Sequence, residues 1–209
     1  MEYRKVKEKN LEYFSGLLNE SEDQHHMVAQ SRISHLKRFE KIIELADFNG
    51  KTLLDVGCGI GGLLDFLKER NIKCQYTGID INPQMIEKAK ELHQESKNDF
   101  LVVDILEEDY NIKYDYVVSN GPLNLIFEDG MNMDITMKMI RKMYELCKSG
   151  MMITMTSSLT RKPNPQTFYY NPVDILGKTF EFCTNVRWDH TYLPHDFALF
   201  CYRKDLYDF

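Results

Sequence analysis

Four glycines within six residues, at positions 57, 59, 61 and 62, are the feature that most restricts how this chain can fold. They follow Thr52-Leu-Leu-Asp-Val56, a predicted buried strand, and lead into a predicted helix from Gly61 to Arg70. Glycines let the backbone turn tightly there and let a ligand approach the main chain closely. A strand that passes through such a turn into a helix predicts a ligand site at the carboxyl end of a parallel sheet.

An acidic side chain stands where a second strand of this sheet is expected to end. Asp80 follows Gly59 by 21 residues and comes directly after the predicted strand Gln75-Tyr-Thr-Gly-Ile79. In a doubly wound sheet this position lies beside the first glycine turn, so the carboxylate can accept hydrogen bonds from two ribose hydroxyls. The order of strand, turn, helix, strand and acid favours an adenosine-type ligand over a tight loop with a solvated aspartate.

Short apolar runs and helical patterns alternate through the rest of the chain, which predicts a parallel sheet covered on both faces. Further predicted strands span 100–103, 114–119 and 151–156, and the predicted helices span 33–46, about 134–147 and a segment opened by Asn82-Pro83. Two strand-like runs at the end, 180–188 and 197–203, leave no room for a crossover helix and must pair antiparallel.

These patterns predict a three-layer, doubly wound α/β fold. Its seven-stranded sheet is mostly parallel and ends in an antiparallel C-terminal hairpin. Residues 1–50, which contain no convincing strand, are expected to form an N-terminal helical cap within the same domain, and residues 51–209 the ligand-binding domain. A chain of this length is expected to fold as one domain.

Composition narrows the class of protein further. The five cysteines are widely spaced with no Cys-x-x-Cys pair, which argues against disulfides and a metal site and for a reducing compartment. The charged start excludes a signal peptide, and no apolar run approaches the roughly 20 residues that cross a bilayer. A formal net charge of −6 argues against a nucleic-acid partner. We therefore expect a cytoplasmic protein that binds neither membrane nor nucleic acid.

The glycine turn carries an acid before its first glycine, in the pattern Asp55-x-Gly57-x-Gly59-x-Gly61. Here the chain resembles the class I S-adenosylmethionine-dependent methyltransferases, whose first motif is D/E-x-G-x-G-x-G. The resemblance covers roughly residues 50–203. It extends to Gly78-Ile-Asp-Ile81 as the second motif, to 98–105 as the third, to 114–120 as the fourth strand, and to an antiparallel seventh strand inserted between the fifth and the sixth.

This resemblance implies a Rossmann-like methyltransferase fold, with S-adenosylmethionine (SAM) as cofactor and S-adenosylhomocysteine (SAH) as product. It implies that Asp80 holds the ribose hydroxyls, that Asp104 accepts from the adenine amino group, and that Ile81 and Ile105 sandwich the ring. The end of the fourth strand, at Asn120, is expected to lie by the methionine part of the cofactor.

Other residues are expected to contribute around the turn. Gly57 and Gly59 would let main-chain atoms line the amino-acid moiety, and Asp55 would brace the turn through backbone N–H groups. Cys58 is interpreted as a small turn residue in the motif and not as a nucleophile. Arg38, on the cap, is either a partner for the methionine carboxylate or an exposed helix charge. The predicted cofactor-binding residues are thus Arg38, Asp55, Gly57, Cys58, Gly59, Asp80, Ile81, Asp104, Ile105 and Asn120.

The charge of the predicted site distinguishes between cofactors. SAM is a sulfonium cation without phosphates, so carboxylates at Asp55, Asp80 and Asp104 suit it, whereas they would repel a pyrophosphate. A nicotinamide-dependent dehydrogenase is disfavoured on this ground and by the glycine spacing.

Methyl transfer from a sulfonium is an in-line displacement, so the enzyme supplies alignment and, where the acceptor must lose a proton, a base. His195, just before the last predicted strand, is the candidate base, with a structural role as the alternative. His25 and His26 lie in a segment that could cover the site. With short insertions and a helical lid, we expect a small-molecule acceptor.

Two alternatives remain open. One is a non-catalytic SAM-binding regulatory module, and the other is a methyltransferase acting on a protein or nucleic acid. Asn120-Gly-Pro-Leu123 only partly matches the Asn-Pro-Pro-Tyr motif of methyltransferases that act on adenine or glutamine, because the second proline and the aromatic residue are missing. The acceptor atom and the oligomeric state stay open.

Overall fold

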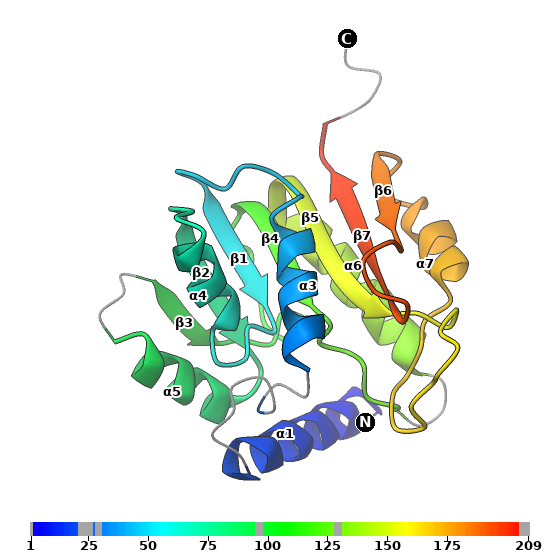
Figure 1. The fold of residues 1–209 in the computed structure, drawn as a ribbon, viewed down its shortest axis with the longest axis horizontal. Coiled ribbons are helices and arrows are strands. Elements are labelled where there is room, and N and C mark those ends of the chain that lie inside the picture. Colours follow the sequence, from blue (N-terminus) through cyan, green and yellow to red (C-terminus); the bar gives the residue numbers. More distant parts are fainter. Residues whose placement is uncertain (1, 21–26, 28–30, 95–97, 128–130, 205–209) are drawn as a thin grey trace.

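The chain forms one seven-stranded sheet with helices on both faces in a computed structural model that describes residues 2–20, 27, 31–94, 98–127 and 131–204 (Figure 1). The strands are β1 (Thr52–Val56), β2 (Gln75–Asp80), β3 (Asp99–Val102), β4 (Tyr114–Asn120), β5 (Cys147–Thr156), β6 (Val186–Asp189) and β7 (Asp196–Tyr202). The helices are α1 (Glu2–Glu20), α3 (Arg32–Ile42), α4 (Gly62–Glu69), α5 (Pro83–Leu92), α6 (Met131–Leu146) and α7 (Pro172–Thr179).

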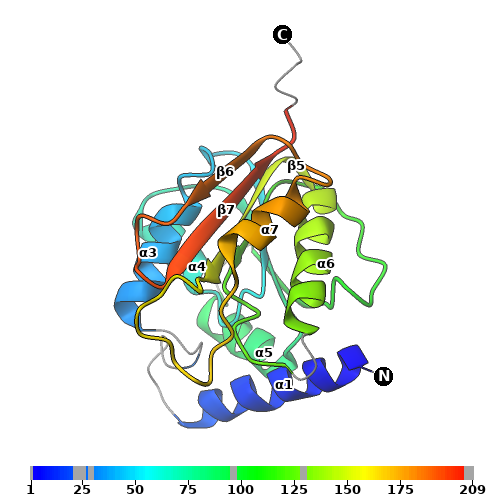
Figure 2. The ribbon, with the colours of Figure 1, turned by 90° about the vertical axis from the view of Figure 1, so that its right-hand side faces the viewer.

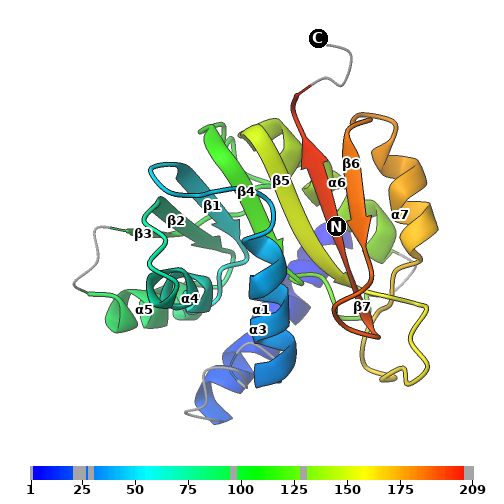
Figure 3. The same cartoon turned by 45° about the horizontal axis from the view of Figure 1, so that its top comes forward.

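The strand order in the sheet is β3-β2-β1-β4-β5-β7-β6. β7 is antiparallel to both of its neighbours, and the other strands are parallel to one another (Figure 3). The chain winds outward from β1 in one direction and from β4 in the other, so the switch point lies between these two strands. The predicted doubly wound fold with its inserted seventh strand is therefore confirmed.

Two apolar layers hold the helices to the sheet (Figure 2). One face of the sheet packs against α3, α4 and α5 through a cluster that includes Phe39, Leu63 and Ile86. The other face packs against α6 and α7 through a cluster that includes Ile140 and Ile175. Helix α1 lies across the end of the sheet where β1, β4 and β5 finish (Figures 1 and 2).

The C-terminal hairpin is shorter than predicted. Residues 180–185 are not strand, because Phe180 closes helix α7, and its side chain is 53% exposed. Helix α7 was not predicted, although Asn171 before it and Pro172 at its start carry the signal that predicts α5. The Asn171 side chain accepts a hydrogen bond from the N–H of Val173, with Pro172 in the first turn, which is the capping chemistry of Asn82-Pro83.

Helix α3 also differs from expectation in the face it buries. Ile33, predicted to be part of the apolar face, is 72% exposed. The buried side chains are instead His35, Arg38, Phe39 and Ile42. Two basic side chains are therefore buried on this helix, which is unusual because such groups are mostly exposed.

Part of the N-terminal segment cannot be compared with its prediction. His25 and His26, which were expected in a covering segment, lie outside the described residues. Within the described ranges, no helix combines the length and the apolar character needed to cross a membrane.

Candidate cofactor and acceptor site

A cavity opens at the carboxyl ends of β1, β2 and β4, at the switch point of the sheet, where open α/β sheets bind their ligands. Nine of the ten predicted cofactor residues line it: Asp55, Gly57, Cys58, Gly59, Asp80, Ile81, Asp104, Ile105 and Asn120. The tenth, Arg38, lies just outside the lining. Residues far apart in the sequence therefore meet at one place, as the motif order predicted.

The glycine turn after β1 is fixed against β2. Gly57, Gly59 and Gly61 have φ angles of 72°, 54° and 87°, in the left-handed region that favours glycine. The N–H of Gly57 donates to the carbonyl of Ile79 at 2.8 Å. A Cβ on Gly61 would lie 2.7 Å from Nε2 of His93, so this position also needs glycine for space.

Asp80 joins the turn to the end of β2. Its Oδ2 accepts from the N–H of Gly59 at 3.0 Å, and its Oδ1 accepts from the N–H of Asn82 at 2.9 Å. Burial raises the pKa of this carboxyl, and these backbone hydrogen bonds oppose the rise. Each oxygen of a carboxylate can accept a second hydrogen bond, so both remain able to receive a ribose hydroxyl.

Asp55 differs from its predicted role. The turn N–H groups of Gly57 and Gly59 donate elsewhere, and Asp55 Oδ2 accepts instead from the hydroxyl of Tyr76, at 2.7 Å. The Asp55 side chain is 3% exposed, and this burial raises its pKa to about 7, with the charge of Asp80 adding to the rise. A cation in the cavity would therefore stabilise the ionised form.

Cys58 is a packing residue in the turn. Its side chain lies against β2, where a Cβ on Gly78 would come within 2.9 Å of the sulfur. Burial, together with the charges of Asp80 and Asp55, raises the pKa of the thiol well above its usual value. The thiol is protonated at neutral pH, which agrees with its interpretation as a turn residue.

Asp104, at the other end of the cavity, is held by the cap helix. Its oxygens accept from the hydroxyl of Tyr3 at 3.0 and 3.1 Å, and Lys7 Nζ lies 2.8 Å from Oδ2. The backbone N–H of Leu106 also donates to Oδ1, at 3.0 Å. Asp104 thus lines the cavity, and helix α1 contacts it as well.

The loop after β4 forms the wall opposite the glycine turn. Asn120 Oδ1 accepts from the hydroxyl of Thr154 at 3.1 Å, which ties the predicted methionine end to β5. A Cβ on Gly57 would lie 3.0 Å from Pro122, so the loop and the turn touch. Tyr170, a buried residue that follows β5, donates to the carbonyl of Leu123 at 2.6 Å and fixes the loop from behind.

Arg38 is not an exposed helix charge. Its side chain is buried, and Nε and Nη2 contact Oδ2 of Asp196. Its Nη1 lies 3.9 Å from where a Cβ on Gly121 would be, at the cavity wall. His195, in contrast, is not among the lining residues. It is half-buried, and its carbonyl accepts from the N–H of Ser157 at 2.9 Å.

The cap contributes residues that sequence reasoning missed. Tyr3, Asn10 and Phe14 of α1 and His35 and Phe39 of α3 line the cavity. The three positions on α1 are spaced by seven and four residues, which places them on one face of a helix. That spacing was the available signal, but it is also typical of a helix that packs against a core.

A sheet with this strand order, a glycine turn after β1 and an acid at the end of β2 is the fold of class I SAM-dependent methyltransferases. A family model described as "Methyltransferase domain" matches residues 47–191, and the chain belongs to that family. The resemblance found in the motifs is thereby confirmed, and SAM is the methyl donor of these enzymes.

Individual relatives match parts of the chain. A malonyl-[acyl-carrier protein] O-methyltransferase of Acetivibrio thermocellus is 40% identical over 88 residues, which cover 41% of this chain and 31% of that protein. A putative methyltransferase, 235L, of Invertebrate iridescent virus 6 is 27% identical over 158 residues, 73% of this chain and 57% of the viral protein. The chain thus spans only about a third of the length of the first of these relatives.

A solved complex of DhpI with SAH has the same fold. It superposes with a TM-score of 0.70 at 13% identity, and the match covers 93% of this chain and 95% of DhpI.

Proposed function

We propose that this chain binds SAM in the cavity and transfers its methyl group to a small-molecule acceptor by in-line displacement. The observation that carries the proposal is the bridge made by Asp80. One carboxylate accepts from the glycine turn and from the residue that caps α5, and it lines the cavity at the switch point, where open α/β sheets bind their ligands. The relation to the methyltransferase family supports the choice of SAM.

The lining suggests how the cofactor lies. The adenine ring would lie between Ile81 and Ile105, near Asp104, and the ribose on Asp80. The amino-acid part would then extend along the glycine turn toward Asn120. Asp55 and Asp80 would face the positive part of the ligand, where an ionised carboxylate has a favourable Coulomb energy.

Bound SAM supplies an electrophilic methyl group on a good leaving group. The chain's own contribution is chiefly alignment. Hydrogen bonds to β2 hold the glycine turn, and Tyr170 holds the loop after β4, so together they would present the sulfonium in one orientation. His195 lies outside the lining, so we do not retain it as the base. His35 is a histidine of the cavity wall and replaces it as the candidate where the acceptor must lose a proton.

A compact acceptor is supported by the enclosure of the cavity. Helix α1 lies across this end of the sheet and contributes to the lining of the cavity, and the lining includes the apolar side chains of Phe14, Leu106, Pro122, Leu123 and Met139. Such a site removes a small acceptor from water, which strengthens the electrostatic alignment of the reaction. A macromolecular acceptor would have to insert one group beneath α1.

Calorimetry on the purified chain tests cofactor binding. We expect wild type to bind SAH, and Asp80→Asn to weaken the affinity at least tenfold, because a neutral amide accepts ribose hydroxyls less strongly and loses a charge-assisted bond. Asp174→Asn, an exposed carboxylate in the first turn of α7, is the matched control and should bind as wild type does.

Two outcomes would redirect the proposal. Absence of heat with both SAM and SAH would overturn it. Cofactor binding without transfer of a labelled methyl group to any member of a metabolite mixture would favour the non-catalytic module instead.

A further inference from the structure

A buried ion pair joins the cap to the antiparallel end of the sheet, beside the proposed methionine end of the cofactor site. Arg38 of α3 is 5% exposed and Asp196 of β7 is 0% exposed. Two donors of the guanidinium, Nε and Nη2, contact the same oxygen, Oδ2 of Asp196. Removing one partner of such a pair leaves an uncompensated charge in the interior, which is strongly unfavourable.

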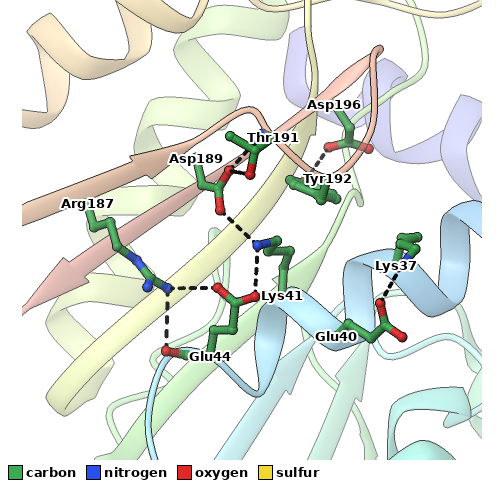
Figure 4. Close-up of polar contacts among 9 residues, drawn as sticks. All are labelled: Lys37, Glu40, Lys41, Glu44, Arg187, Asp189, Thr191, Tyr192 and Asp196. Carbon is green, nitrogen blue, oxygen red and sulfur yellow. Dashed lines mark hydrogen bonds and ion pairs between the residues drawn. The ribbon is translucent and has the colours of Figure 1, made fainter.

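The carboxylate is the fixed member of this pair. Asp196 begins β7 and lies opposite Thr156, the last residue of β5, so the sheet sets its position. Its second oxygen, Oδ1, accepts from the hydroxyl of Tyr192 at 2.8 Å (Figure 4). The ring of Tyr192 is in turn packed near the ammonium of Lys41, which lies 5.7 Å from the ring centroid.

A second, separate contact ties α3 to β6, the other strand of the C-terminal hairpin. Lys41 Nζ lies 2.9 Å from Oδ2 of Asp189 in β6 and 2.8 Å from Oε1 of Glu44, as Figure 4 shows. This pair is half-exposed at most and lies one turn of helix beyond Arg38. It anchors α3 to the hairpin without touching the guanidinium.

A further nitrogen of the guanidinium, Nη1, lies near the wall of the cofactor site. Nη1 of Arg38 comes within 3.9 Å of where a Cβ on Gly121 would lie, and Gly121 lines the cavity next to Asn120. A guanidinium has five N–H donors in one plane, so it can contact Asp196 on one edge and a second carboxylate on another.

We infer that Asp196, assisted by Tyr192, is a positioning residue that holds the Arg38 guanidinium where it contacts the carboxylate of the cofactor's methionine part. The inference rests on the proposed function, because it assigns one end of the same ligand. Asp196 does not touch the cofactor itself. It fixes the plane of the guanidinium and balances its charge. Recognition of the cofactor's carboxylate therefore depends on the geometry of the hydrogen bonds that Arg38 donates.

A pair of ligands separates this role from a structural one. SAH has the amino-acid carboxylate, and 5′-methylthioadenosine keeps the adenosine and thioether but lacks it. We expect Asp196→Asn to weaken SAH binding about tenfold or more and to leave the affinity for methylthioadenosine within twofold of wild type. Arg38→Ala should give the same pattern, and the double variant should be no weaker than Arg38→Ala alone, because both changes remove one interaction.

Two further variants complete the test. Asp189→Asn breaks the neighbouring contact between α3 and the hairpin and should leave both affinities unchanged. Tyr192→Phe removes only the hydroxyl that donates to Asp196 and should weaken SAH binding two- to fivefold; it decides the question if Asp196→Asn does not fold.

The inference is overturned if Asp196→Asn, or Tyr192→Phe in its place, weakens both ligands equally or weakens neither. Wild-type protein that binds neither ligand would instead overturn the proposed function, so the two failures are distinguishable.

Discussion

At the scale of single residues, two glycines with left-handed φ angles differ in what surrounds the position of an added Cβ. Gly61 has a φ of 87°, and a Cβ there would lie 2.7 Å from His93 Nε2 and 2.8 Å from Phe100 Cζ. His93 is itself buried, and its ring stacks on Phe100, so neither ring can move away cheaply. Gly50 has a φ of 70° but nothing within 4 Å of its would-be Cβ.

This pair gives a prediction about stability. Gly50→Ala should cost about 1 kcal/mol of unfolding free energy, from backbone strain alone. Gly61→Ala should cost about 2 kcal/mol more, because strain and overpacking combine. Urea denaturation of the two variants measures the difference, and equal losses would show that the predicted clash has no energetic effect.

The residue scale also shows which parts of the candidate cavity can be predicted from sequence. The glycines, Asp80 and Asp104 are recognisable because their spacing follows the ends of successive strands. Tyr76, the partner of Asp55, was not recognised, because a tyrosine inside a predicted strand is typical of any β-sheet. The buried position of Arg38 depends on its ion pair with Asp196, which is 158 residues away in the sequence. No local sequence pattern predicts such a pairing.

At the scale of elements, strands and crossover helices followed from periodicity, and the exceptions are informative. The predicted strand over 180–188 is apolar, but its first part follows the end of α7 and is not strand. There Phe182 packs on Tyr144 and lies under Arg141. The buried face of α3 differs from the prediction because periodicity counts apolar residues, whereas this helix also buries the basic side chains of His35 and Arg38.

Lys7 helps to hold helix α1 against the cavity, and its two ion pairs lead to a prediction about the stability of this helix. Lys7 Nζ lies 2.8 Å from Asp104 and 2.9 Å from Glu107. Lys7→Met removes both pairs. The exposed pair with Glu107 contributes little, but buried Asp104 loses its counter-charge and keeps only its hydrogen bonds from Tyr3 and Leu106, so the loss should be about 1–2 kcal/mol. Hydrogen exchange should therefore become several-fold faster in α1, with the amides of β4 and β5 unchanged.

Arg4→Met is the matched control for this experiment. Arg4 pairs with Glu8 at 2.9 Å within α1, on an exposed surface, and its loss should not change how α1 docks. Exchange in α1 that is the same for Lys7→Met and wild type would mean that other contacts, such as the hydrogen bond of Tyr3 to Asp104 and the apolar packing of Val6, hold the helix.

At the scale of the whole molecule, one buried carboxyl should make stability depend on pH. The pKa of Asp55 is about 7 in the folded chain and about 3.9 when unfolded. Between these values the folded state keeps a proton that the unfolded state has lost. The contribution of Asp55 is therefore most favourable below about pH 4 and declines as the pH rises to 7, by roughly 4 kcal/mol in total.

Comparison with Asp55→Asn isolates this effect, because asparagine does not titrate and still accepts from Tyr76. Urea denaturation between pH 5 and pH 8 should show wild type losing stability relative to the variant as the pH rises. A constant difference between the two proteins across this range would show that Asp55 ionises normally in the fold.

The position of the antiparallel strand has a consequence for biosynthesis. β7 lies in the middle of one half of the sheet but comes last among the described strands, and Asp196 is its first residue. A growing polypeptide can assemble the glycine turn and Asp80 early, yet it must emerge from the ribosome past residue 196 before Arg38 can pair with Asp196. Nascent chains arrested upstream of that point should therefore be unable to retain the amino-acid end of the methyl donor.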